Sequence, residues 1–131
     1  MPEPFDRLDA YRSAINLVGQ VRPLVLRLRR REDAMADQLH RAVLSVACNT
    51  AEGAGEFSAG DKARLYRYAL RSAAEATAIL DAARAINMME AAEHQTCRDT
   101  SVRLVAMLTR LVLVTSARAE RRSPNPKKSP R

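Results

Sequence analysis

Residues 37–56 read DQLHRAVLSVACNTAEGAGE, and this stretch decides the fold. Its apolar residues recur at the three- and four-residue steps that place side chains on one face of an α-helix. They are Leu39, Val43, Val46 and Ala47. We predict a helix over about 34–51 that ends in the polar cluster Asn49–Gly53. Gly53 or Gly55 is the expected stop, because glycine is favoured just past a helix C-terminus.

Apolar spacing predicts three further helices, over about 6–30, 61–87 and 91–118. The apolar series of the 61–87 segment is a heptad seam whose small side chains let helices approach closely. Its members are Tyr66, Ala69, Ala73, Ala76, Leu80 and Ala83. Asp6 is the expected N-cap of the first helix. Pro23 falls inside that helix, and a kink is favoured over a break because the apolar spacing continues in phase across it.

Short connections between these segments make neighbouring helices antiparallel. The expected fold is therefore all-α, an antiparallel up-down-up-down four-helix bundle over residues 1–118. Only 4% of the residues are aromatic and none is Trp, which suits closely packed helices better than a sheet sandwich. Residues 119–131 hold three prolines and no large apolar residue, so we predict a disordered basic tail there.

The net charge of +7 is unevenly distributed. Residues 119–131 carry five basic residues against Glu120, while the other 118 residues carry 17 basic and 14 acidic groups, so the bundle itself is only mildly basic. The N-terminal residues include no apolar run typical of a secretory signal. Cys48 and Cys97 lie in helical patterns rather than in a disulfide framework. We therefore expect a cytoplasmic protein.

The fourth helix indicates self-association. Between Val102 and Ala117 the only charges are Arg103 and Arg110, which are seven residues apart and share one face. A helix of a small monomeric bundle needs an apolar stripe of only about 100°, so the excess apolar surface is expected to be buried against another copy. The alternative is a centrally buried helix in a monomer, which four helices do not easily provide. No membrane partner is expected, because this run is interrupted and short for a bilayer.

Residues 37–56, with KARLYRYALRSAAEATAILDAARAINMM at 62–89, resemble the four-helix-bundle proteins of the 23S rRNA intervening-sequence family. In that family the second helix reads like D-Q-L-R-R-A-x-x-S-x-x-x-N-x-A-E-G. The matching positions here are Asp37, Gln38, Leu39, Arg41, Ala42, Ser45, Asn49, Ala51, Glu52 and Gly53. The third-helix signature is matched by Tyr66, Ala69, Ser72, Ala73, Glu75 and Leu80. The resemblance covers about residues 5–118 and departs from the pattern at His40 and Cys48.

This resemblance implies a cytoplasmic bacterial bundle that commonly forms a homopentameric ring. A relative, the accessory variability protein of diversity-generating retroelements, binds nucleic acid and reverse transcriptase. For most members no biochemical activity is established. The resemblance therefore implies a fold and an assembly, and for function it gives only a hint of nucleic-acid or protein partners.

Asn49, Glu52 and Gly53 form the first candidate site, a recognition or assembly point. Glu52 in the last turn faces the negative end of the helix dipole and should need a partner, such as Arg64, Arg67 or nearby loop amides. The alternative, which we favour, is a structural clasp that fixes the turn between the second and third helices.

A basic stripe on the third helix is the first nucleic-acid-binding candidate. Its members are Lys62, Arg64, Arg67, Tyr68 and Arg71. Guanidinium groups at this spacing can contact successive phosphates, and the Tyr ring can stack on a base. The alternative is a solvated face on which Arg71 pairs with Glu75 four residues later.

Arg27, Arg30 and Arg31 near the end of the first helix are the second nucleic-acid-binding candidate. Cations at a helix C-terminus complement the dipole, which is a sufficient explanation by itself. Together with the basic tail, these arginines could also add to a polyanion-binding surface.

The sequence offers no chemistry for catalysis. His94 and Cys97 form one weak pair without a second pair at metal-ligand spacing, and we find no phosphate loop, nucleophile elbow or zinc-protease motif. We expect no metal, no cofactor and no enzymatic activity. The favoured reading is a homo-oligomeric scaffold or adaptor that binds RNA or DNA non-specifically. The alternative is a protein–protein interaction module whose charge mainly keeps it soluble.

Overall fold

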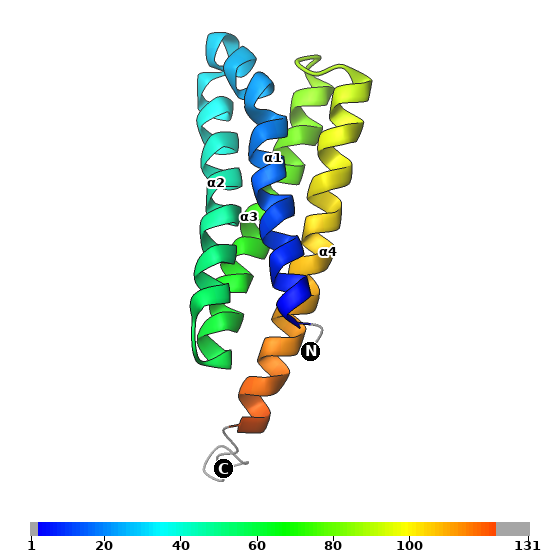
Figure 1. Cartoon of the computed structure of the whole chain (residues 1–131). Helices are drawn as coiled ribbons and strands as arrows, with labels where there is room; N and C mark the ends of the chain where they lie inside the picture. Colours follow the sequence, from blue (N-terminus) through cyan, green and yellow to red (C-terminus); the bar gives the residue numbers. More distant parts are fainter. Residues whose placement is uncertain (1–2, 123–131) are drawn as a thin grey trace, which may run out of the picture.

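The computed structural model describes the backbone of residues 3–122 and the side chains of residues 9–122. This part folds as helices without a strand: α1 (Glu3–Arg31), α2 (Asp33–Gly55), α3 (Ala59–Ala85) and α4 (Ala91–Arg122). Successive helices run in opposite directions, and α4 returns beside α1 (Figure 1). The up-down-up-down four-helix bundle predicted from the sequence is confirmed.

The core follows the predicted periodicity. All six residues of the heptad seam on α3, from Tyr66 to Ala83, are fully buried. Because five of these six residues are not bulky aliphatics, the leucines and valines of the other helices fill most of the remaining core volume. The largest of these fully buried side chains include Leu17, Leu24, Leu28, Leu39, Leu104, Leu108 and Leu111.

Helix α1 runs without interruption through Pro23, so the break considered for this position does not occur. Pro23 is exposed, which leaves water to satisfy the carbonyl that its missing N–H cannot reach. Leu17 and Leu24 on either side of it stay buried on one face. The helix begins at Glu3, so Asp6 lies inside its first turns, and the prediction of Asp6 as N-cap is wrong.

Helix α2 continues through Gly53 and ends at Gly55, the second of the two glycines predicted as its stop. No glycine among the described residues has a positive φ; the chain leaves α2 through the extended residue Glu56. Ser58 then caps α3, because its hydroxyl accepts a hydrogen bond from the Asp61 N–H at 3.0 Å.

The turn from α3 to α4 is a Schellman motif. Asn87 adopts φ 62°, and its N–H donates to the Arg84 carbonyl at 3.1 Å. The Met88 N–H donates to the Ala83 carbonyl at 2.9 Å. Asn tolerates this left-handed conformation better than most residues. The motif turns the chain at the end of the bundle where α1 also ends (Figure 1).

Helix α4 extends to Arg122. The prediction of a disordered tail over 119–131 is therefore wrong for residues 119–122, which continue the helix because they are good helix formers without proline. Residues 123–131 lie outside the described residues.

The apolar surface of α4 is only partly covered. Leu104, Leu108 and Leu111 are buried, whereas Leu113 is 65% exposed and Val102 is also exposed. The whole helix is long and apolar enough to span a membrane by length and composition, a test that core helices of soluble bundles also pass. Its exposed apolar side chains support self-association, which stays a prediction here.

Candidate nucleic-acid interface

A chain of polar side chains joins α2 to α3. The Asn49 amide donates to the carbonyl and the hydroxyl of Ser45, both at 3.0 Å. The Ser45 hydroxyl lies 2.8 Å from the hydroxyl of Ser72 on α3. Each of these groups is half-buried, where an unmade hydrogen bond is costly. Asn49 therefore has a structural role within the protomer.

Lys62, rather than Glu52, fastens the end of α2. The Lys62 ammonium donates to the carbonyls of Gly53 at 3.1 Å and Ala54 at 3.0 Å, which belong to the last turn of the helix. The Gly53 carbonyl also accepts a hydrogen bond from the Glu56 N–H at 3.3 Å. Glu52 is exposed and forms no ion pair within the described residues. The predicted pairing of Glu52 with Arg64 or Arg67 is therefore wrong, because a cation from α3 already neutralises this helix end.

Two of the five stripe residues on α3 form hydrogen bonds to neighbouring helices. Besides Lys62, Arg67 donates from Nη2 to the Ser116 hydroxyl of α4 at 2.8 Å. The predicted pair of Arg71 with Glu75 is not formed in the described part of the chain. The stripe therefore has fewer available cations than the sequence suggested.

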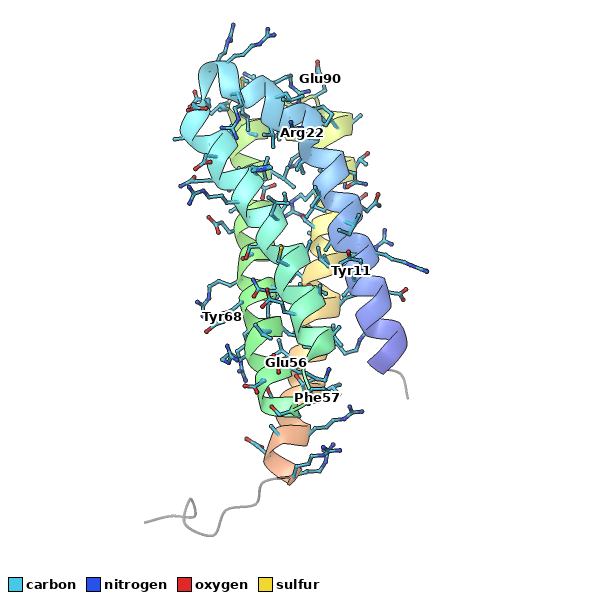
Figure 2. The ribbon with its side chains drawn as sticks, turned by 60° about the vertical axis from the view of Figure 1, so that its left-hand side comes forward. Tyr11, Arg22, Glu56, Phe57, Tyr68 and Glu90 are labelled. Carbon is cyan, nitrogen blue, oxygen red and sulfur yellow. The ribbon has the colours of Figure 1, made fainter. Side chains whose placement is uncertain are left out.

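The remaining three stripe residues share the outward side of the helix, and we call Arg64, Tyr68 and Arg71 the α3 face. Tyr68 is 41% exposed and projects from α3 (Figure 2). Arg64 Nη2 lies 3.3 Å from Asp61 Oδ1. Hydrogen bonds to Asp61 and then to Tyr68 raise the pKa of Arg64, so this guanidinium stays charged beside the phenol.

The loop between α2 and α3 contains an aromatic side chain that the sequence analysis missed. Phe57 is 97% exposed at the tip of this loop (Figure 2). It lines a small cavity of about 80 Å³ together with Lys62, Arg118 and Arg122. The sequence feature that could have indicated this residue is an isolated Phe between Glu56 and Ser58, outside any helical apolar pattern.

The second basic candidate lies at the opposite end of the bundle. Arg27 Nη2 is 2.5 Å from Glu93 Oε1, and Arg27 Nε donates to the Met88 carbonyl at 3.2 Å. Arg30 and Arg31 are exposed beside it. This end is about 30 Å from the α3 face at 1.5 Å per helical residue. The two predicted basic regions therefore do not form one surface within a protomer.

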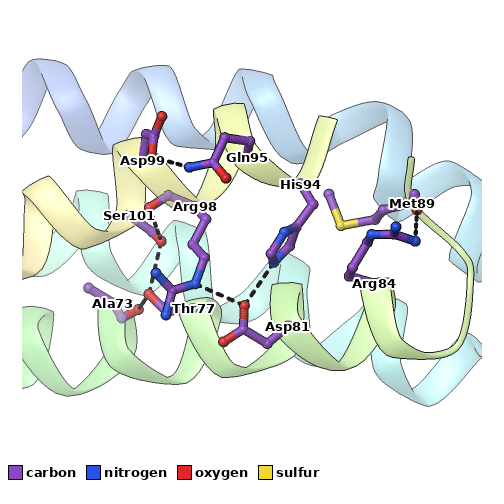
Figure 3. Close-up of polar contacts among 10 residues, drawn as sticks. All are labelled: Ala73, Thr77, Asp81, Arg84, Met89, His94, Gln95, Arg98, Asp99 and Ser101. Carbon is purple, nitrogen blue, oxygen red and sulfur yellow. Dashed lines mark hydrogen bonds and ion pairs between the residues drawn. The ribbon is translucent and has the colours of Figure 1, made fainter. Parts of the chain in front are cut away.

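An ionic cluster joins α3 to α4 at the same end (Figure 3). Asp81 Oδ1 lies 2.8 Å from His94 Nε2 and accepts a hydrogen bond from Arg98 Nε at 3.0 Å. The hydrogen bond with His94, and then that with Arg98, hold the pKa of Asp81 below its usual value. No group of three His, Cys, Asp or Glu side chains in the described part of the chain is placed to hold a metal ion.

Residues 6–110 of the chain match the 23S rRNA-intervening sequence protein family. The chain belongs to this family. A crystal structure of similar fold is that of a protein of unknown function from the S23 ribosomal protein family of Bacteroides thetaiotaomicron, with a TM-score of 0.73. Its identity of 16% extends over 79% of this chain and 97% of that chain, which shows the fold alone. Comparison with curated proteins gives no match.

In this member of the 23S rRNA-intervening sequence protein family, some of the signature residues quoted above lie at the contact between α2 and α3. Ser45 of α2, which accepts a hydrogen bond from Asn49, lies against Ser72 of α3, and Gly53 lies against the ring of Tyr66. This part of the signature therefore describes how α2 packs on α3, and the exposed arginines of the α3 face do not belong to the signature.

Proposed function

We propose that this protein is a non-enzymatic, cytoplasmic scaffold that associates with itself and binds RNA or DNA without reading the base sequence. The α3 face is the observation that carries the proposal. Arg64 and Arg71 lie seven residues apart, about 10 Å along the helix, and exposed Tyr68 lies between them. One strand can then place phosphates on both guanidinium groups and a base on the phenol.

One such face binds weakly, because few phosphates are neutralised and Asp61 offsets part of the Arg64 charge. Repetition of the face around an oligomer raises the effective affinity without any new contact. Exposed apolar side chains outside the core support such an assembly, and they include Tyr11, Ile15, Leu44, Val102 and Leu113. A ring of five copies is what the family resemblance implies.

The test is fluorescence anisotropy with labelled single- and double-stranded RNA and DNA at several salt concentrations. We expect the logarithm of the binding constant to fall linearly with the logarithm of the salt concentration. The variant Arg64→Gln/Arg71→Gln should lower that slope by about two phosphate contacts per protomer, and Tyr68→Ala should weaken single-strand binding most. The matched control is Arg12→Gln/Arg22→Gln, which removes two exposed charges from α1.

Equal loss in the α1 control would contradict a site on the α3 face and indicate attraction by net charge alone. A chain ending at Arg122 keeps all four helices and separates the bundle from residues 123–131. Binding that disappears in this shortened chain would move the function from the bundle to the C-terminal residues.

A second candidate function is a protein–protein interaction module with no nucleic-acid role. It is favoured by an apolar groove of about 340 Å³ on the outer side of the α3–α4 contact, with Ala74, Ala78, Val102 and Val105 in its lining. Apolar contacts respond little to salt, whereas phosphate contacts respond steeply. Absence of nucleic-acid binding at low salt would favour this candidate.

A further inference from the structure

A surface groove opens at the end of the bundle where α1 ends and α3 turns into α4. Its volume is about 480 Å³, which is within the range of small-molecule sites. We call it the arginine groove, and its lining residues are Leu26, Arg27, Arg30, Arg31, Asn87 and Met88. Three of the six are arginines and none is acidic.

The arginine groove contains more positive charge than the ion pairs of the fold neutralise. Arg27 is held by Glu93 and the Met88 carbonyl, and the neighbouring Arg29 pairs with Asp33. Arg30 and Arg31 form no ion pair within the described residues. The C-terminus of α1 carries the equivalent of about half a negative charge, so these two guanidinium groups leave a clear positive excess. Guanidinium forks match the geometry of phosphate oxygens.

The rest of the lining is apolar with one amide. Leu26 is 52% exposed on α1, and half-buried Met88 packs against the core from the Schellman turn. Such a combination of an apolar wall, the Asn87 amide and free cations suits a flat heterocycle that carries a phosphate. An adjoining groove of about 440 Å³ is lined by Glu90 and Glu93 as well as Arg84, so its carboxylates disfavour the same ligand.

We propose that the arginine groove binds a phosphate-bearing nucleotide, with the phosphate on Arg30 and Arg31 and the heterocycle against Leu26 and Met88. The nucleotide is either free or the 5′-terminal residue of a single strand, because both present the same chemistry. The volume of about 480 Å³ and the exposed apolar wall favour a nucleotide over an acidic peptide. It lies about 30 Å from the α3 face, so this inference does not depend on the function proposed above.

The test uses isothermal titration calorimetry on the full chain. The probes are inorganic phosphate, AMP, ADP, and one single-stranded hexanucleotide with either a 5′-phosphate or a 5′-hydroxyl. We expect saturable AMP and ADP binding that is tighter than phosphate binding. The variant Arg30→Gln/Arg31→Gln should weaken AMP and ADP binding about ten-fold or more, because it removes both guanidinium groups that would hold the phosphate. Both side chains are exposed, so the substitutions should not disturb folding. Leu26→Ala should reduce the preference for AMP over phosphate.

Two control variants keep this test separate from that of the α3 face. Arg12→Gln/Arg22→Gln removes the same charge from α1 outside the groove, and Arg64→Gln/Arg71→Gln removes the α3 face; neither should change AMP binding. A 5′-phosphate preference of the hexanucleotide would identify a strand end as the source, and binding of mononucleotides alone would identify the free ligand. Failure of every nucleotide to bind, equal weakening in the α1 control, or binding of a polyglutamate peptide in place of nucleotides would overturn the proposal.

Discussion

The ring of Tyr66 occupies the space that a side chain at Gly53 would need. A Cβ atom at Gly53 would lie 2.7 Å from Tyr66 Cε1 and 2.9 Å from Tyr66 Cδ1, closer than carbon atoms approach without displacement. Tyr66 is fully buried, so its ring is confined by the core and cannot move aside freely. The absence of a side chain at position 53 is therefore what lets the end of α2 lie against α3.

We expect Gly53→Ala to lower the free energy of unfolding by about 1–3 kcal/mol, because an added methyl group forces the buried ring or the helix to shift. The control is Gly19→Ala, where an added Cβ has no neighbour within 4 Å. At this exposed position inside α1, alanine should raise stability by up to about 1 kcal/mol. Urea unfolding at one protein concentration measures both. Equal stability of Gly53→Ala and the parent protein would show that the contact relaxes without cost.

Lys62→Met should lower stability by about 1 kcal/mol, because the Ala54 carbonyl loses its donor and the Gly53 carbonyl keeps only the hydrogen bond from the Glu56 N–H. The matched variant Glu52→Ala, at the same helix end, should change protomer stability by no more than about 0.5 kcal/mol, since Glu52 is exposed. A larger destabilisation by Glu52→Ala that grows with protein concentration would show that Glu52 contacts another copy. Thermal melts at two concentrations, with mass measurement by light scattering, separate these outcomes.

Ser45 and Ser72 should be energetically coupled through their hydroxyl groups, which are 2.8 Å apart. In a double-mutant cycle with Ser45→Ala and Ser72→Ala, we expect a coupling energy of about 0.5–1.5 kcal/mol. The reason is that either single variant leaves a half-buried hydroxyl with one partner fewer. Chemical denaturation of the four proteins measures the cycle. Strictly additive effects would mean that water replaces this hydrogen bond at no cost.

Asp81→Asn should destabilise the protein near neutral pH and lose its effect in acid. Hydrogen bonds from His94 and Arg98 lower the pKa of Asp81 in the folded state, so folding favours the ionised carboxylate. This contribution is complete above the unfolded pKa of about 3.9 and is lost as the pH falls through the lower folded value. Because Asp81 is half exposed, the difference at pH 7 should stay below about 1 kcal/mol.

Urea unfolding of Asp81→Asn and the parent protein between pH 7 and pH 3 measures this dependence. The difference between the two stabilities should shrink as the pH falls toward the acid end of the range. A difference that is constant with pH would assign the effect to lost packing rather than to the charge of Asp81.

The fold was predictable because helical periodicity is a local property. The heptad seam on α3 and the apolar face of α2 both follow from spacing along the chain, and both are buried. The wrong pairing of Glu52 falls where a side chain acts on a distant residue, because Lys62 of α3 donates to the end of α2. The choice between Gly53 and Gly55 as the helix stop stayed open for the same reason, because the role of Gly53 depends on a ring thirteen residues further along.

The candidate interface was predictable in composition but not in which residues are available. When the third helix is considered alone, Lys62, Arg67 and Arg71 are equivalent cations. In the bundle, Lys62 donates to the end of α2 and Arg67 donates to Ser116 of α4. These partners lie on other helices, so no spacing within the third helix indicates them. Phe57 was missed for the opposite reason, because a single apolar residue in a loop has no periodicity.

The sequence by itself determined the number of helices, their order, their buried faces and the family, since each of these follows from residue spacing and local motif. Only the tertiary structure decided which polar and charged groups are engaged in hydrogen bonds and ion pairs within the fold. It also brought the end of α1 beside the α3–α4 turn to form the arginine groove. The physical reason is the range of the interactions: backbone hydrogen bonding and amphipathicity act within a few residues, whereas side-chain contacts depend on how helices far apart in the chain are placed.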